Sequence, residues 1–116
     1  MPYIVHRDEL RGTTGTGWKR IDLLGKDVAE LVGANFELLV LEPGESSPMH
    51  GHADCEHYLF VLQGEGFLGL EDGEHRIEEN YVISVDPGER HAVRNSGQKK
   101  LEILEFIIPG GGRYPA

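Results

Sequence analysis

The chain has 116 residues, the length of one domain, and a domain of this size buries about two thirds of its unfolded surface without disulfide support. Twenty Asp and Glu residues against eleven Lys and Arg residues give a formal net charge of -9. This acidic balance argues against nucleic acid and anionic membranes as partners, because binding to phosphates requires a basic surface.

Short apolar runs separated by turn residues predict an all-β domain. Sixteen glycines and six prolines punctuate these runs, and turns recur about every 8 to 12 residues, as in a β-sandwich or closed barrel. The predicted strands cover residues 3–7, 18–24, 36–42, 57–62, 66–70, 75–79, 81–85 and 101–108, together with a strand that contains His91. We interpret 1–116 as a single domain, with an N-terminal strand and loop over 1–17 and a loose tail over 109–116.

The glycine-rich segment 11–19 invites comparison with a phosphate-binding loop. Gly12 and Gly17 have the required spacing, but Trp18 stands where that motif needs Lys, and no Ser or Thr follows Lys19. We therefore expect a surface loop there.

Residues 27–33 fit two structures. Asp27 and Glu30 could cap one helical turn that Gly33 closes, or the segment could pair as an edge strand. After the next strand, Gly44 in a Pro-Gly turn allows a sharp bend that returns the chain across that strand.

Three histidines lie within eight positions at the start of an apolar strand. Residues two apart in an extended chain point to the same side, so His50 and His52 project together. His57 heads the next strand, on the face that also carries Leu59 and Val61. Two antiparallel strands could thus aim three imidazoles at one point, and neutral imidazole is the commonest protein ligand for divalent transition metals.

Other polar residues near these histidines are less persuasive. His91 follows a Pro-Gly turn and is a fourth candidate ligand, whereas His75 adjoins an exposed turn among charges and is left out of the site. Asn95 fits a turn residue better than a ligand. The single cysteine, Cys55, excludes an internal disulfide and fits a free thiol on a loop better than a soft ligand.

The first histidine cluster resembles a conserved motif of the cupin family. That motif reads Gly, five residues, His-x-His, three or four residues, Glu, six residues, Gly. Gly44, His50, His52 and Gly64 match it, and His57 stands in the Glu position.

A second stretch resembles the other cupin motif. That motif reads Gly, five residues, Pro-x-Gly, two residues, His, three residues, Asn. Gly88, His91 and Asn95 match, whereas Asn80 replaces the first Gly and Asp86 replaces the Pro. Together the two motifs span residues 44–95.

The resemblance implies a double-stranded β-helix, or jelly roll, with a metal site inside one mouth. It is closest to the small single-domain cupins with four histidine ligands, here His50, His52, His57 and His91. Glu56 also fits the spacing after His52, but its strand parity is opposite to that of Leu59, so we favour His57. Small cupins commonly pair through edge strands, which implies a homodimer.

Four neutral imidazoles would leave the charge of a divalent ion uncompensated. This predicts that the remaining positions on the metal take water, hydroxide or an anionic oxygen ligand such as an enolate or carboxylate. The family resemblance favours manganese or iron as the ion, with nickel, copper and zinc also open.

Three functions fit this site. The first is a metal-dependent oxygenase or dioxygenase acting on a small organic molecule inside an apolar barrel. Strand parity suggests the wall of its cavity, namely Leu59, Val61, Val93, Leu104 and Phe106. The second is a metal-dependent isomerase or decarboxylase, which requires an inward acid or base that the sequence does not identify. The third is a non-catalytic module that binds a metal and a small molecule.

Residues 1–8 do not combine a positively charged start with an apolar segment. The apolar runs are also far shorter than the roughly 20 residues that span a bilayer. We therefore expect a soluble, cytoplasmic protein with no membrane partner.

Overall fold

The computed structural model describes residues 4–10, 12–15, 18–24, 33–49 and 55–109. Within these ranges the regular structure consists of strands and one short 3-10 helix, η1 (Arg7–Glu9). The strands are β1 (Gly12–Gly15), β2 (Trp18–Asp22), β3 (Asn35–Leu41), β4 (Cys55–Gln63), β5 (Glu65–Leu70), β6 (Gly73–Glu78), β7 (Val82–Val85), β8 (Ala92–Asn95) and β9 (Leu101–Pro109). The predicted all-β class is confirmed.

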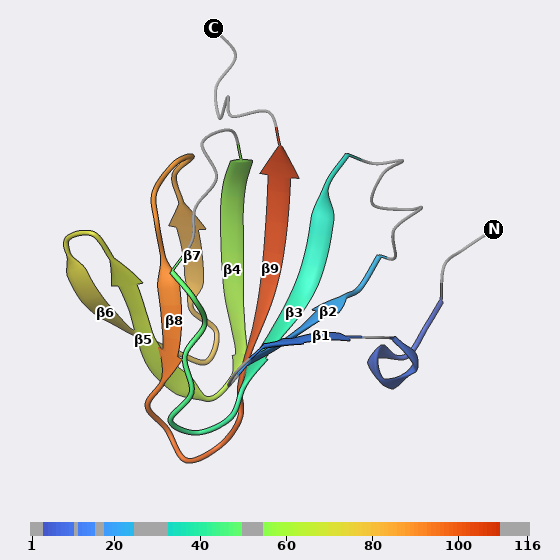
Figure 1. The fold of residues 1–116 in the computed structure, drawn as a ribbon, viewed down its shortest axis with the longest axis horizontal. Helices are drawn as coiled ribbons and strands as arrows, with labels where there is room; N and C mark the ends of the chain where they lie inside the picture. Colours follow the sequence, from blue (N-terminus) through green and yellow to red (C-terminus); the bar gives the residue numbers. More distant parts are fainter. Residues whose placement is uncertain (1–3, 11, 16–17, 25–32, 50–54, 110–116) are drawn as a thin grey trace, which may run out of the picture.

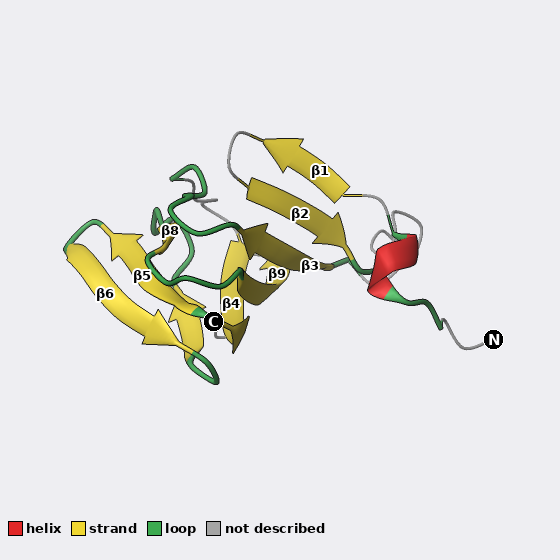
Figure 2. Cartoon of the chain, turned by 90° about the horizontal axis from the view of Figure 1, so that it is seen from below, coloured by secondary structure: helices red, strands yellow, loops and turns green. Residues whose placement is uncertain are grey.

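The strands form two antiparallel sheets. One sheet has six strands in the order β1-β2-β3-β9-β4-β7, and the other has three in the order β6-β5-β8. The last strand, β9, lies between β3 and β4, as Figure 1 shows. Seen from below, β5 and β6 form a layer apart from β1, β2 and β3 (Figure 2). The last strand of the chain is thus inserted between two strands that come much earlier in the sequence.

The apolar core fills the space between the sheets. It joins residues from both layers: Leu39, Leu41, Leu59, Val61, Leu68, Ile77, Val85, Val93, Leu101 and Ile103. Alternation along β9 places Leu101, Ile103 and Glu105 on the buried inner face, because successive strand residues point to opposite sides. The two sheets therefore enclose a common interior, and one of its side chains is a carboxylate.

The N-terminal region differs from the prediction. Residues 4–6 form no strand, because the backbone N–H of Asp8 donates to His6 Nδ1 at 3.1 Å and starts η1. The expected loop contains strand β1, which pairs with β2 in the register Gly12↔Ile21 to Gly15↔Trp18. A partner strand next along the chain thus draws this glycine-rich segment into the sheet.

Two glycines occupy positions that require this residue type, and Gly44 takes the role that the sequence suggested. Gly44 has φ +83°, a left-handed conformation that suits the bend after β3. Gly66 lies where β5 and β8 approach closely, because a Cβ there would collide with the Arg94 carbonyl oxygen.

Some expectations concern segments outside the described residues. They are the alternative structures for 27–32 and most of the predicted tail, 110–116; Pro109 is the last residue of β9. The part of the chain that the structure describes holds no helix with the length and apolar character needed to cross a bilayer.

Candidate metal centre

Two histidines and a glutamate converge at one end of the interior. His57, His91 and Glu105 each offer one ligand atom, and these atoms lie within 4.8 Å of one another. All three are buried, with at most 2% of their surface exposed. The rings of His57 and His91 meet edge to face with their centroids 4.8 Å apart. We call these three residues the buried trio.

Strand register explains how the trio assembles. Leu59 of β4 faces Glu105 of β9 directly, so His57, two residues earlier on β4, is a diagonal neighbour of Glu105 on the same face. The His57 Nδ1 atom lies 3.8 Å from Glu105 Oε1. His91 comes from the other sheet, immediately before β8, with its Nδ1 3.4 Å from the Glu89 carbonyl oxygen. The site therefore joins both sheets.

The chemistry of this donor set fits a metal ion. Imidazole nitrogen and carboxylate oxygen are common ligands of divalent first-row transition metals. A buried carboxylate beside two imidazoles also supplies negative charge that an ion would neutralise. The trio can thus hold a divalent cation, and it offers one anionic ligand where the sequence suggested neutral imidazoles alone.

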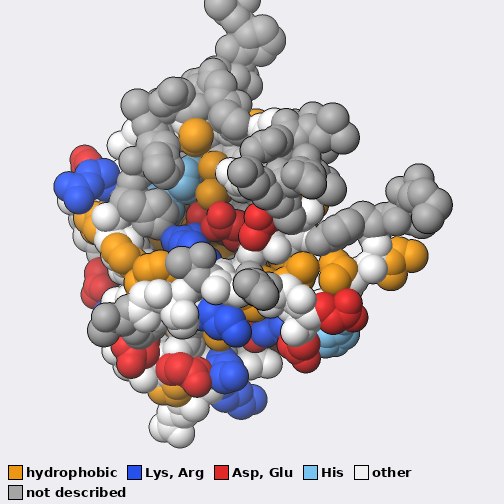
Figure 3. Space-filling view, turned by 45° about the vertical axis from the view of Figure 1, so that its right-hand side comes forward, with side chains coloured by type: hydrophobic (Ala, Val, Ile, Leu, Met, Phe, Trp, Pro, Cys, Tyr) orange, Lys and Arg blue, Asp and Glu red, His pale blue; other side chains and the backbone are white. Residues whose placement is uncertain are grey.

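Two further charged side chains continue the site across the sheet. Arg20 Nη1 donates to Glu37 Oε2 at 3.1 Å and to Glu105 Oε1 at 3.2 Å. Burial raises the pKa of the Glu37 carboxyl above its ordinary value of 4.5, and the Arg20 guanidinium opposes that shift. In Figure 3, histidine, acidic and basic side chains gather with hydrophobic ones on one face of the molecule.

Of the four predicted ligands, the structure brings two together. His57 and His91 meet in the buried trio, whereas His50 and His52 lie outside the described residues. Glu105 was missed, because it belongs to neither family motif. One signal could have found it: a charged residue at an alternate position of β9 that otherwise carries buried Leu101 and Ile103.

The predicted cavity wall is partly corrected. Leu59, Val61 and Val93 lie in the buried core beneath the site. Leu104 and Phe106 do not line the interior, because β9 turns Ile103 and Glu105 inward and its even-numbered residues outward. Phe106 is 39% exposed and packs against Phe36 of β3 instead.

Residues set aside in the sequence have other roles. Glu56 is buried on the face of β4 opposite to His57, and it accepts a hydrogen bond from the Tyr58 hydroxyl at 2.8 Å. His75 is exposed and pairs with Asp72 at 2.9 Å. Cys55 is a free thiol at the start of β4.

Asn95 supports the backbone near the apolar end of the interior. It is buried, and its side-chain amide donates to the carbonyl oxygens of Leu41 and Lys99 at 2.9 and 2.8 Å. Its Oδ1 accepts from the backbone N–H of Gly97 at 2.9 Å. These bonds join the end of β3 to the turn before β9, so its role is structural.

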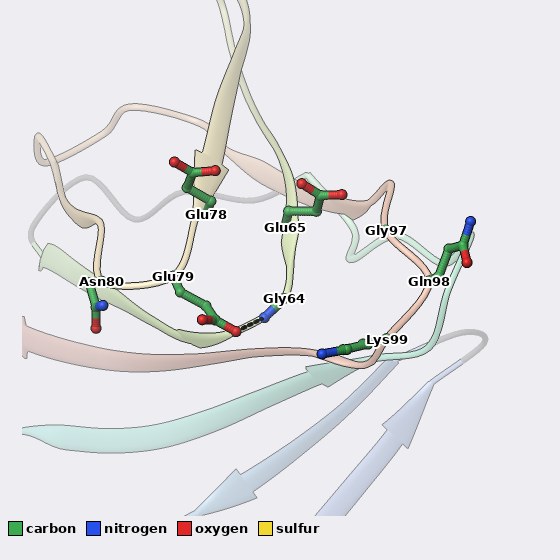
Figure 4. A pocket seen from close by; sticks show the side chains of 8 residues that line it. All are labelled: Gly64, Glu65, Glu78, Glu79, Asn80, Gly97, Gln98 and Lys99. Carbon is green, nitrogen blue, oxygen red and sulfur yellow. Dashed lines mark hydrogen bonds between the residues drawn. The ribbon is translucent and has the colours of Figure 1, made fainter.

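A hollow opens at the other end of β4. It has a volume of about 620 Å³ and is lined by Gly64, Glu65, Glu78, Glu79, Asn80, Gly97, Gln98 and Lys99. Figure 4 shows Glu79 turned to the backbone N–H of Gly64, a hydrogen bond of 3.2 Å. The side chains of Glu65 and Glu78 are 45% and 49% exposed. These carboxylates are accessible to water, unlike the side chains of the buried trio.

Comparisons with known proteins agree with this fold. A family model described as the cupin domain matches residues 37–107. An oxalate-binding protein from Thermotoga maritima is 31% identical over 86 residues, which cover 74% of this chain and 71% of that protein. The tetracenomycin polyketide synthase protein TcmJ from Streptomyces glaucescens is 30% identical over 69 residues, covering 60% of this chain and 46% of TcmJ. The crystal structure of a predicted oxalate decarboxylase from T. maritima matches with TM-score 0.82 at 27% identity, over 92% of this chain and 99% of that one.

Proposed function

This chain belongs to the cupin family, and we propose that it binds a divalent transition metal ion and, through that ion, a small carboxylate anion. The family match confirms the resemblance to cupins seen in the sequence, and the structural match confirms the double-stranded β-helix. The set of four histidine ligands stays a prediction. The observation that carries the proposal is the buried trio, since His57, His91 and Glu105 offer three ligand atoms within 4.8 Å.

His50 and His52 complete the proposed ligand set. The chain before them runs along β8: Ser46 bridges Arg94, and the backbone of Ser47 donates to the Val93 carbonyl oxygen at 2.8 Å. This pairing brings Ser47 alongside Val93, two residues from His91. The direction of the described chain thus supports a ligand role for the two histidines that follow it.

A small carboxylate suits both the chemistry and the relatives. A divalent ion bound at the trio would supply a positive centre for carboxylate or enolate oxygens. Leu59, Val61 and Val93 keep the adjoining interior apolar, which strengthens such an electrostatic contact. A relative that is 31% identical is named an oxalate-binding protein, so oxalate is the first anion to test. Manganese and iron are the ions we expect first.

Metal binding is tested by elemental analysis of purified protein and by titration of the metal-free protein with Mn²⁺, Fe²⁺, Co²⁺, Ni²⁺ and Zn²⁺. His91→Ala should lower affinity by more than the roughly 10- to 100-fold that loss of a residue supporting a metal ligand costs. His75→Ala is the matched control, because His75 is exposed and distant in sequence from the trio. Equal affinity in wild type and His91→Ala would contradict the proposal.

Anion binding is tested by calorimetric titration of oxalate into metal-loaded and metal-free protein. Heat of binding is expected only when the metal is present. Oxalate that binds equally well without metal would show that the anion does not reach the protein through the ion.

An oxygenase remains a second proposal, favoured by the apolar side chains beneath the trio. Oxygen uptake by iron- or manganese-loaded protein with diketones, thiols or phenols tests it. In an isomerase or decarboxylase the buried Glu105 would instead serve as the inward acid or base, and release of carbon dioxide from oxalate tests that alternative. Inert protein that retains an anion would favour the binding module.

We further propose a homodimer formed through the outer face of the six-stranded sheet. Val82 on β7 is 72% exposed, and Phe106 and Ile108 on β9 are 39% and 37% exposed. Strand β4 lies between β7 and β9, and β7 is the edge strand. Covering such apolar side chains is favourable at about 25 cal/mol per Å². Light scattering should give twice the chain mass, and Val82→Lys should shift the mass toward the monomer. A monomeric wild type would contradict this.

A further inference from the structure

The inner face of the six-stranded sheet opposes two carboxylates at close quarters. Glu37 of β3 and Glu105 of β9 are direct cross-strand partners. Like charges in this position repel and destabilise a sheet. Glu105 is 1% exposed and the Glu37 side chain 22%, so water screens their repulsion poorly. A cation between them would offset this repulsion.

Arg20 provides that cation. Its position on β2 opposite Leu39 turns it to the same inner face. A single nitrogen, Nη1, donates to Glu37 Oε2 at 3.1 Å and to Glu105 Oε1 at 3.2 Å. The guanidinium also lies 5.9 Å from the Trp18 ring centroid, and only 19% of the side chain is exposed. Arg20 is therefore held in place as it bridges the two acids.

The bridge reaches the buried trio through one oxygen atom. Glu105 Oε1 accepts the bond from Arg20 and is also the oxygen that lies 3.8 Å from His57 Nδ1. Charged and polar groups thus follow one another across four neighbouring strands, β2, β3, β9 and β4. One carboxylate oxygen therefore links His57 to Arg20, a residue that belongs to neither histidine motif.

We propose that Arg20 is a positioning residue of the metal centre, which holds the Glu105 carboxylate toward His57 by bridging it to Glu37. The inference rests on the proposed metal-binding function. Without Arg20, Glu105 would turn away from Glu37 and lose its fixed place beside His57.

The test compares metal affinity and the visible absorption of the Co²⁺-loaded protein in Arg20→Met and wild type. Met keeps an apolar stem and removes the guanidinium. We expect affinity to fall roughly 10- to 100-fold, the range seen when a group that orients a metal ligand is lost, together with a changed Co²⁺ spectrum. Arg20→Lys keeps the charge and should recover part of the affinity.

Arg94→Met is the matched control. Arg94 also pairs with a glutamate, Glu74, at 3.1 Å and lies 4.7 Å from an aromatic centroid, that of Phe67, but on the three-stranded sheet. It should leave affinity and spectrum unchanged. An equal effect of both arginine changes would show a general charge effect and overturn the inference.

The double variant Arg20→Met/Glu37→Gln separates positioning from relief of repulsion, and it also serves if Arg20→Met does not fold. Removal of the opposing charge should restore stability but leave metal affinity low. Full recovery of wild-type affinity would mean that Arg20 only offsets repulsion, and would overturn the inference. Failure of the wild type to bind any metal would instead contradict the proposed function.

Discussion

The buried face of strand β9 has an apolar end and a charged end. Leu101 and Ile103 are fully buried in the apolar core, and two positions further Glu105 is as well buried among His57 and Arg20. The apolar and the charged side chains of this face are therefore equally inaccessible to water. At the Leu101 end, burial stabilises the fold through the hydrophobic effect. At the Glu105 end, burial costs free energy unless each charge has a partner, and that cost is tolerated where it prepares a site.

Separate substitutions at the two ends of β9 are the strongest test of this comparison. Leu101→Ala should lower the free energy of unfolding by about 2–5 kcal/mol, because it removes a buried side chain and leaves a cavity. Metal affinity of the folded fraction should not change. Urea unfolding of metal-free protein, followed by metal titration without urea, measures both quantities.

Glu105→Gln should do the reverse, with a large loss of metal affinity. If Leu101→Ala weakened metal binding as much as Glu105→Gln does, the two ends would not be separate in function.

The fold could be predicted because its signals are local. Alternating apolar residues and Pro-Gly turns located β3, β5 and β9 to within a residue or two. The spacing of the histidines singled out His57 and His91, which lie close together in the structure. The sequence did not show which face of β9 is turned inward, because both faces carry apolar residues. Leu104 and Phe106 are as apolar as Leu101 and Ile103, which occupy the interior.

Glu105 was hidden for a related reason. Its value as a ligand comes from strand register, which places it beside Leu59 and next to His57, residues nearly fifty positions away in the chain. Arg20 and Glu37 are likewise unremarkable until β2 and β3 pair with β9. Three of the histidines, in contrast, lie within eight positions of one another, so the sequence alone indicated a metal site there.

A smaller effect is expected at the apolar end from Asn95→Ala. The change leaves the buried carbonyl of Leu41 without its hydrogen bond and frees the turn at Gly97, at a cost of about 1–3 kcal/mol. Metal affinity should remain that of the wild type, although Asn95 matches a family motif. Asn35→Ala, at an exposed position, is the control for thermal unfolding. Weaker metal binding by Asn95→Ala would place Asn95 in the site.

The charged end should respond to pH through Glu37. Burial raises the pKa of this carboxyl, so the folded state holds its proton at a pH where the unfolded state has released it. Stability contributed by the protonated form is therefore lost as pH rises from about 4.5 through the raised pKa. In metal-free protein, Glu37→Gln should gain stability relative to wild type across that window. A difference that does not depend on pH would contradict this.

The smallest effect is expected at the hollow beside Gly64. It tests whether the metal ion binds at the buried trio or at a wide, open group of carboxylates. Glu78→Gln should change stability by less than about 0.5 kcal/mol and leave metal affinity unchanged, because this side chain is 49% exposed and its contact with Arg76 is screened by water. Gly64, which lines the hollow, follows His57 by seven positions, about 23 Å of extended chain, so no direct effect on the trio is expected. Chelator competition with Mn²⁺ measures the affinity. The hollow is wide, but its carboxylates are accessible to water. A tenfold loss of metal affinity in Glu78→Gln would mean that this open acidic surface, and not the buried trio, holds the ion.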